Sequence, residues 1–441
     1  MRSDGTFEAI GSHRILAIHG GRGDAQRYRC VHLRQQLGLC RIPCQVREFR
    51  GESSEANHDY DLVVFHRIPF DRYIDRLVSQ IHERGGLVIF DTDDLIFDSS
   101  ALGWVRALSN EDALRIELHT RDVGLYRRML GISDAVLVST DYLARQTSAL
   151  GKPSRVHRNA FSLEMLSTSQ DARGQQRRRD NRIVIGYASG TPTHNRDFQE
   201  ARPALQEILG KYPRAELRII GPLDPGHDWG TLRERIRHVP FVPWRELPHL
   251  LAQFDVNIAP LEPGNPFCEA KSEVKYIEAG LVGVPTVASR IGAFEFAIRP
   301  GENGFLASTH DEWTEALERL VGDAALRREM GERAYEDVLQ RYHPLVRGRE
   351  LISTLNGIAK GVRGRPLWNE EAIIPLDVRQ LQEAGLSASL SGDFDHHEKY
   401  PSLIARSLYA IRYRGLRVFL MQGWVFVKRR VMHLFGRRSA G

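Results

Sequence analysis

The feature that most constrains the fold is an alternation of short apolar segments with amphipathic helical patterns. Apolar segments occur at 14–21, 61–66, 86–94 and 135–140, and each ends in glycine or polar residues. Strands that are apolar almost throughout are typical of a parallel sheet with helices on both faces. Ligands of such sheets bind at the carboxyl ends of the strands, where these polar residues lie. Residues 1–168 are therefore predicted to form a parallel α/β domain.

The same alternation restarts further along the chain, with apolar segments at 182–190, 215–222, 256–261 and 285–289. These segments predict a second parallel α/β domain. The stretch between the two domains is charged and has no periodicity, which is typical of a linker. The predicted parts after the first domain are a linker at 169–181, the second domain at 182–343, a helix at 344–360 that closes this domain, an irregular segment at 361–399 and a tail at 400–441.

Length and composition agree with two domains in a globular protein. The chain has 441 residues, of which 42% are hydrophobic and 27% are charged. The N-terminus has no apolar core typical of a signal peptide, and no apolar run reaches the ~18 residues of a spanning helix. We therefore expect a cytoplasmic protein, with reduced, structural cysteines at Cys30, Cys40, Cys44 and Cys268.

Positive charge is concentrated in the tail. From Tyr400 onward there are nine Lys or Arg and no Asp or Glu, so the net charge of +5 leaves −4 for the rest of the chain. Apolar residues in the tail recur at helical spacing: Leu416, Phe419, Leu420, Trp424, Val427 and Val431. Anionic membrane surfaces attract a basic amphipathic helix of this kind. The alternatives are docking on the protein's own surface or on RNA; elsewhere the chain has little of the aromatic and basic interleaving that would favour nucleic acid.

Several motifs together resemble a known enzyme family. The segment 265–308, which contains KYIEAG, resembles the donor-binding half of GT-B fold glycosyltransferases, in particular family 4 (group 1) enzymes of bacterial surface-polysaccharide synthesis. The resemblance continues through 310–344, and segments 186–198 and 156–162 match earlier parts of the family in the same order. It covers roughly 13–358. It implies two Rossmann-like domains that face each other across a cleft.

The resemblance also implies an activity. Family members transfer a sugar from a nucleotide-diphosphate sugar with retention of configuration, usually without a metal or other cofactor. The C-terminal domain would bind the donor, and the N-terminal domain would present a glycan or lipid-linked acceptor. Because such acceptors are often built on lipid carriers, the basic tail is interpreted as attaching the enzyme to the inner face of the cell membrane. Two alternatives stay open: a nucleotide-sugar epimerase, and a non-catalytic homologue that binds nucleotide sugar or glycan.

Two residues of KYIEAG are the main donor-site candidates. The family's matching glutamate accepts both ribose hydroxyls, and the resemblance places Glu278 in this role. The alternative is a first-turn glutamate that complements the helix dipole. Lys275 lies three residues earlier on the same helical face, and Lys271 four residues before that. Cations must offset the charge of a departing diphosphate when no metal does so; the alternative for both residues is a solvated lysine.

This sequence departs from the family pattern at the first of its two glutamates. In the family the two glutamates are separated by seven residues. Counting back from Glu278 by this spacing gives Ala270, and Glu269 is one position away. Either the loop is shifted so that Glu269 serves, or Lys271 and Ser272 act in its place.

A loop with glycine follows the first strand of the second domain. Backbone amides of such a loop can approach a pyrophosphate, and Arg196 could add a charge-assisted contact. The alternative is a tight turn with a helix cap at Asn195. The candidates in this loop are Ser189, Gly190, Thr191, His194, Asn195 and Arg196.

On the acceptor side, His19, Gly20 and Gly21 end the first strand, where glycines permit close approach of a ligand or simply make the turn. His66 ends the second predicted strand. The resemblance implies a histidine in this region that faces the transferred sugar, so His66 is the catalytic candidate of the first domain. The catalytic candidates of the second domain are Lys275 and Glu269. A packing role is the alternative for His66.

The sequence DTDD at 91–94 resembles the metal-binding DxD of another transferase class. So short a match arises easily by chance, and it lies in the half predicted to bind the acceptor. Asp91, Asp93 and Asp94 are therefore interpreted as an acceptor-side cluster or helix cap. No metal site is expected.

Overall fold

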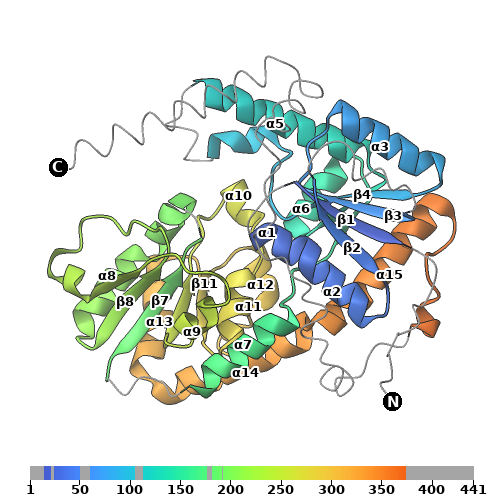
Figure 1. The fold of residues 1–441 in the computed structure, drawn as a ribbon. Coiled ribbons are helices and arrows are strands. Elements are labelled where there is room, and N and C mark those ends of the chain that lie inside the picture. Colours follow the sequence, from blue (N-terminus) through green and yellow to red (C-terminus); the bar gives the residue numbers. More distant parts are fainter. Residues whose placement is uncertain are drawn as a thin grey trace, which may run out of the picture.

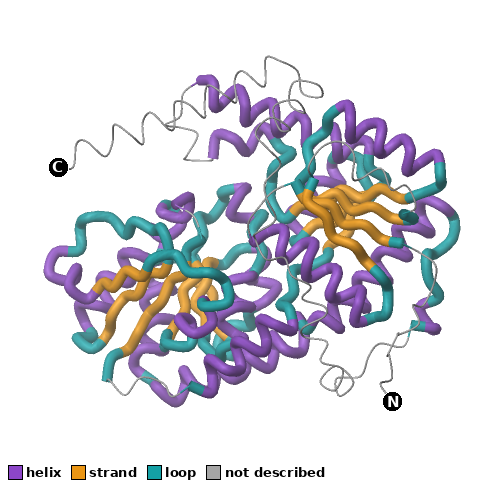
Figure 2. The backbone as a smooth tube through the Cα atoms, in the orientation of Figure 1, coloured by secondary structure: helices purple, strands orange, loops and turns teal. Residues whose placement is uncertain are grey.

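The computed structural model describes residues 14–20, 24–49, 60–104, 113–175, 181–190 and 192–373. Within them the chain forms two α/β domains, each built on a parallel sheet of six strands (Figure 1). Helices lie around both sheets (Figure 2). Gly21, Thr191 and the tail at 400–441 lie outside the described residues.

The first sheet has the strand order β2-β1-β3-β4-β5-β6. The central strands are apolar and every residue in them is buried, as the sequence predicted. The two edge strands, β2 and β6, were not predicted because each is partly exposed and lacks an apolar run. The strands are β1 (Ile15–His19), β2 (Cys44–Glu48), β3 (Leu62–His66), β4 (Leu87–Thr92), β5 (Ala135–Val138) and β6 (Ser154–Val156).

Amphipathic helices pack on this sheet. In α3 the Asp71 carboxylate caps the N-terminus by accepting the backbone N–H of Tyr73 and Ile74, and the apolar side of the helix is buried. The helical segments of this half are α1 (Asp24–Gln26), the π-helical turn η1 (Arg27–Val31), α2 (His32–Leu39), α3 (Arg72–Glu83), η2 (Ser99–Trp104), α5 (Ala113–Ile132), α6 (Asp141–Ala149) and α7 (Leu163–Gly174).

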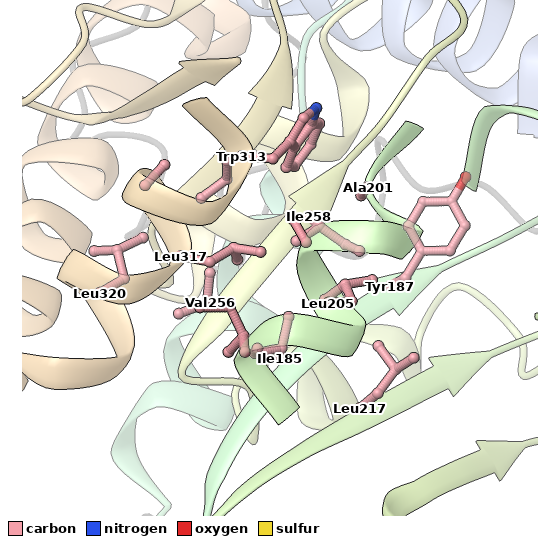
Figure 3. Close-up of a cluster of buried hydrophobic side chains, with 14 of the residues drawn as sticks. Ile185, Tyr187, Ala201, Leu205, Leu217, Val256, Ile258, Trp313, Leu317 and Leu320 are labelled. Carbon is pink, nitrogen blue, oxygen red and sulfur yellow. The ribbon is translucent and has the colours of Figure 1, made fainter. Parts of the chain in front are cut away.

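The second sheet has the order β12-β11-β10-β7-β8-β9. One face packs against α8 and α13 through a large apolar cluster that includes Ile185, Leu205, Ile258, Trp313 and Leu317 (Figure 3). The strands are β7 (Ile183–Ala188), β8 (Ala215–Ile220), β9 (Ile236–Val239), β10 (Val256–Ala259), β11 (Thr286–Ser289) and β12 (Gly304–Ala307). The strands β9 and β12 were not predicted.

The helical segments of the second half alternate with these strands. They are η3 (Pro192–Asn195), η4 (Asp197–Glu200), α8 (Arg202–Lys211), η5 (Gly230–Arg235), α9 (Leu247–Leu251), α10 (Pro266–Glu269), α11 (Val274–Leu281), α12 (Gly292–Ala297), α13 (His310–Gly322), α14 (Ala324–Tyr342), α15 (Pro344–Arg363) and η6 (Glu370–Ala372).

The helix α15 corrects the sequence prediction. It was predicted to close the second domain, but it runs back to the first domain and packs on α2 (Figure 1). Its buried residues Leu351, Ile352 and Leu355 join the core cluster of β1. A Cβ on Gly348 would lie 2.6 Å from the backbone oxygen of Gln36, so the two helices approach closely. The reason is that the apolar side of α15 completes the outer face of the N-terminal sheet.

The predicted linker also differs from the structure. Its first residues, 169–174, belong to α7, which begins after the cap residue Ser162 and was not recognised from the pattern. The structure describes no residue between 175 and 181. No helix in the described part of the chain is both long enough and apolar enough to cross a membrane.

Candidate functional site

A cavity of about 250 Å³ lies between the two domains and receives side chains from both. Its lining carries charged side chains of both signs, and an apolar wall lies on the side of the second domain. The charged and titratable residues that line it are Asp24, Arg27, Tyr28, Arg67, Asp93, His194, Lys271, Lys275 and Glu278, and the apolar wall includes Phe241, Val242, Trp244, Leu247 and Leu261.

The helix α11 directs Lys275 and Glu278 into this cavity, because residues three apart share a helix face. Since α11 begins at Val274, Glu278 lies beyond the first turn, and no acidic residue occupies that turn. The alternative role of complementing the helix dipole therefore does not apply. One carboxylate oxygen of Glu278 accepts a 2.7 Å hydrogen bond from the hydroxyl of Tyr28, across the domain interface.

Partial burial and nearby charges shift the pKa values of these two residues. Burial raises the pKa of Glu278, although the charge of Arg27 and the hydrogen bond from Tyr28 act in the opposite direction. Burial lowers the pKa of Lys275, opposed by the charge of Glu278. The ammonium of Lys275 donates to the backbone oxygen of Ala188, at the end of β7. A bound anion beside the Lys275 ammonium would favour its charged form.

Lys271 links the cavity to the first domain. Its ammonium lies 3.0 Å from a carboxylate oxygen of Asp94. Arg67 contacts Asp93 at 2.7 Å and Asp94 at 3.5 Å, so a chain of ion pairs crosses the interface. Arg67 has a φ of 50°, in the left-handed region that side chains rarely adopt. Such strain persists where the surroundings enforce it and is common at functional sites.

Asp91 and His66 lie beneath the cavity and do not line it. Asp91 is fully buried, and its carboxylate accepts hydrogen bonds from Arg29 at 3.1 Å and from His66 Nδ1 at 2.7 Å. Burial by itself would raise the pKa of Asp91, but the charge of Arg29 and the hydrogen bonds from His66 and Arg29 together hold this pKa well below its usual range. His66 is only 2% exposed. A catalytic role of His66 remains a prediction.

The structure separates the three predicted aspartates. Asp93 faces the cavity, Asp94 pairs with Lys271, and Asp91 is buried beneath them. Each of them pairs with a cation. Across the described residues, no group of three His, Cys, Asp or Glu side chains is placed to hold a metal ion.

The loop after β7 contributes only part of what was predicted. Ser189, Gly190 and His194 line the cavity. The Asn195 side chain instead accepts the backbone N–H of Asp224 at 3.0 Å, which stabilises a neighbouring turn.

Arg196, from the same loop, is half-exposed and pairs with Glu262 rather than lining the cavity. Both Asn195 and Arg196 are thus held by contacts within the second domain. Their predicted donor contacts remain predictions.

Ala270, which stands where the family has its first glutamate, lies at the interface between the two domains. Ala270 is fully buried in the apolar cluster of the first domain, where a carboxylate would be costly. Glu269 ends α10, half-buried and outside the cavity. Ser272 and Lys271 do line the cavity, and the Ser272 hydroxyl accepts a 2.8 Å hydrogen bond from Asn159. Of the two alternatives, the geometry favours Lys271 with Ser272.

His19 and Gly20 lie at the end of β1 and do not line the cavity. His19 is buried, and the Gly20 backbone N–H donates to the backbone oxygen of His66 at 3.1 Å. A Cβ on Gly20 would lie 2.6 Å from the backbone oxygen of Arg67. Glycine is therefore required here by packing between two strand ends, whatever ligand binds nearby.

Sequence reasoning missed a cation–aromatic contact across the interface. The Arg27 guanidinium lies 4.5 Å from the ring centre of Tyr28 and 4.6 Å from that of Trp244. Arg27 and Tyr28 could have been recognised as site candidates, because they follow shortly after the glycine-rich end of the first strand. Trp244 follows β9, an edge strand without an apolar run, and therefore carried no signal of its own.

The family comparison matches the second domain. The model of the family Glycosyl transferases group 1 matches residues 182–323, from β7 to the end of α13. These residues form a group 1 glycosyltransferase domain. The match contains Lys271, Lys275 and Glu278.

Curated relatives match over part of their length. A D-inositol 3-phosphate glycosyltransferase of Corynebacterium efficiens is 31% identical over 147 residues, which is 30% of this chain and 33% of the relative. Its counterpart in Corynebacterium diphtheriae is 42% identical over 62 residues, or 14% of each chain. The chain thus spans a third or less of the length of these relatives.

Solved structures share the whole two-domain fold. Sucrose-phosphate synthase from Thermosynechococcus elongatus superposes with a TM-score of 0.56 at 15% identity, covering 79% of this chain and all of that one. HepE of Anabaena, in complex with UDP and glucose, gives a TM-score of 0.52 at 15% identity over 78% of this chain and all of HepE. The group 1 domain is therefore one half of a GT-B fold, as the sequence predicted.

Proposed function

We propose that this chain is a retaining glycosyltransferase that moves a sugar from a nucleotide-diphosphate sugar to a glycan or lipid-linked acceptor without a metal. The observation that carries the proposal is the interdomain cavity, which is lined by Lys271, Lys275 and Glu278 of the group 1 domain. Two ammonium groups and a carboxylate match two polar parts of a nucleoside diphosphate: its anionic phosphates and its ribose hydroxyls, which can donate hydrogen bonds.

In the proposed reaction the bond from the anomeric carbon to the phosphate oxygen breaks, and its electron pair stays on that oxygen. The acceptor oxygen bonds to the same face of the carbon and passes its proton to the departing diphosphate. Lys271 and Lys275 would offset the new negative charge, supported by the backbone amides of the loop at Gly190. Most of the rate would come from this charge stabilisation and from proximity.

The absence of a metal requirement is supported by the cations that already pair with the aspartates of 91–94. Arg29, Arg67 and Lys271 take the places that a divalent ion would need beside these carboxylates. A nucleotide site that instead relies on lysines is consistent with this charge pattern.

The experiment that tests the function is a thermal-shift screen of the purified full chain against nucleoside diphosphates and their sugars, with and without EDTA. UDP is the first nucleotide to include, because HepE is solved with it. A shift that survives EDTA is expected, followed by sugar transfer or donor hydrolysis. A shift that EDTA abolishes would refute metal independence, and binding without turnover would favour the non-catalytic homologue. Conversion of donor alone to an isomer would favour the epimerase.

The second part of the proposal is that residues 400–441 attach the protein to an anionic membrane. Nine positive charges without a negative one support electrostatic attraction of about 1 kcal/mol per residue near the surface. Deleting 400–441 is expected to abolish pelleting with phosphatidylserine vesicles while donor hydrolysis remains. Pelleting of the truncated chain would refute the attachment.

A further inference from the structure

His194 is a titratable residue of the cavity that the proposed reaction does not yet use. It lies in η3, on the loop that leaves β7, and lines the cavity together with Lys271 and Lys275. Its Nδ1 lies 2.8 Å from a carboxylate oxygen of Asp197, and its side chain is 16% exposed. A carboxylate at Nδ1 fixes that nitrogen as the one that carries hydrogen. The second ring nitrogen, Nε2, has no hydrogen bond within the described residues.

Asp197 is itself held rigidly. Its other carboxylate oxygen accepts the Cys268 thiol at 3.1 Å and the Glu262 backbone N–H at 3.4 Å. Although burial acts in the opposite direction, the hydrogen bonds from His194 and Cys268 lower the pKa of Asp197. The carboxylate is therefore ionised and oriented at neutral pH. The result is an Asp–His pair whose ring borders the cavity.

The charges around His194 decide its protonation. Burial lowers its pKa, and the ammonium groups of Lys275 and Lys271 add to this, while Asp197 acts in the opposite direction. With no anion in the cavity, the imidazole is consequently neutral near pH 7. A bound diphosphate would bring negative charge next to both lysines, and this favours the protonated imidazole.

We propose that His194 is a donor-binding residue that takes up a proton when the nucleotide sugar enters and then donates from Nε2 to the diphosphate. This inference rests on the proposed function and adds a further cation beside Lys271 and Lys275, one that is charged only when the ligand is present. The departing nucleoside diphosphate carries more negative charge than the donor. The contact would therefore strengthen as the sugar leaves.

The test is calorimetric titration of the full chain with UDP-glucose, or with the corresponding sugar of the base that the thermal-shift screen selects. The diphosphate of such a donor is esterified at both ends and lacks the phosphate group that titrates near pH 6, so protons taken up must bind to the protein. Titrations at pH 7.5 in two buffers of different ionisation enthalpy give the number of protons per ligand. We expect uptake by the wild type and little or none by His194→Gln.

The pH dependence gives a second readout. Wild type is expected to bind roughly three- to tenfold more tightly at pH 6.5 than at pH 8.0, because binding is coupled to protonation, and His194→Gln is expected to lose this difference. His310→Gln is the control, because His310 is an exposed histidine of the same domain that pairs with Glu207 outside the cavity. It should behave as wild type.

Each outcome has one meaning. Equal proton uptake by wild type and His194→Gln would assign it to another group, with Lys275 the first candidate, and would overturn the inference. Donor binding by wild type without uptake would overturn it too, while the proposed function would stand. Failure of the wild type to bind any nucleotide sugar of the screen would instead refute the proposed function and this inference together.

Discussion

Replacing Glu278 by glutamine separates its proposed role in binding from a role in stability. The substitution keeps the volume of the side chain and one acceptor oxygen, which the hydroxyl of Tyr28 can still use. It removes the negative charge and puts an N–H donor where the second ribose hydroxyl would donate. Hydrogen bonds to charged groups contribute about 1.5–3 kcal/mol. We therefore expect the Kd for the nucleoside diphosphate to rise roughly 10- to 100-fold, since about 1.4 kcal/mol is tenfold.

The effect on stability should have the opposite sign. The pKa of Glu278 is raised above its ordinary value, chiefly by burial, so the folded protein disfavours the charged form relative to the unfolded chain. At pH 7 the ionised carboxylate therefore lowers the free energy of unfolding. The neutral amide removes this penalty, so the ligand-free variant should have a Tm equal to or above that of wild type.

The assay combines calorimetric titration with the nucleotide found in the screen and thermal unfolding without ligand. Glu315→Gln provides the matched control, because Glu315 is an exposed glutamate on α13 of the same domain. It should change neither quantity. A Tm several degrees lower for Glu278→Gln with a Kd within twofold of wild type would refute the reasoning. Glu278 would then be a structural partner of Tyr28 and not a ligand contact.

Two further predictions concern the scaffold. Gly186→Ala should destabilise the second domain by about 1–3 kcal/mol, because its Cβ would lie 2.1 Å from the Phe254 ring. The added Cβ of Gly210→Ala in α8 has nothing within 4 Å, so this variant should be neutral or stabilising by up to about 1 kcal/mol. Equal Tm values for the two variants would contradict this prediction. Burial lowers the pKa of His32 and His157 to about 3, below the unfolded value near 6.5, so the unfolded chain binds more protons and stability falls as the pH drops below about 6.5. At pH 5.5 each histidine should lower the free energy of unfolding by about 1.4 kcal/mol relative to pH 7.5. A urea midpoint as high at pH 5.5 as at pH 7.5 would exclude neutral buried histidines.

Periodicity in the sequence was sufficient to predict the central part of both domains. Strands such as Leu62–His66 are buried on both faces, so nearly every residue is apolar and the pattern is visible without a structure. Edge strands such as Cys44–Glu48 are covered on one side only, and their mixed composition carries no such signal. The pairing of Lys275 with Glu278 on one helix face was likewise predictable, since helical geometry fixes it locally.

The sequence by itself thus determined two parallel α/β domains, their order and the local spacing of Lys275 and Glu278. Only the tertiary structure decided which groups face these residues. The Tyr28 hydroxyl reaches Glu278 from 250 positions away, and Asp94 reaches Lys271 from 177 positions away. Only the tertiary structure shows that α15 packs on the first domain and that Ala270 is buried at the interface. Such contacts depend on how two separately patterned sheets pack against each other, and neither local periodicity nor spacing along the chain encodes that packing.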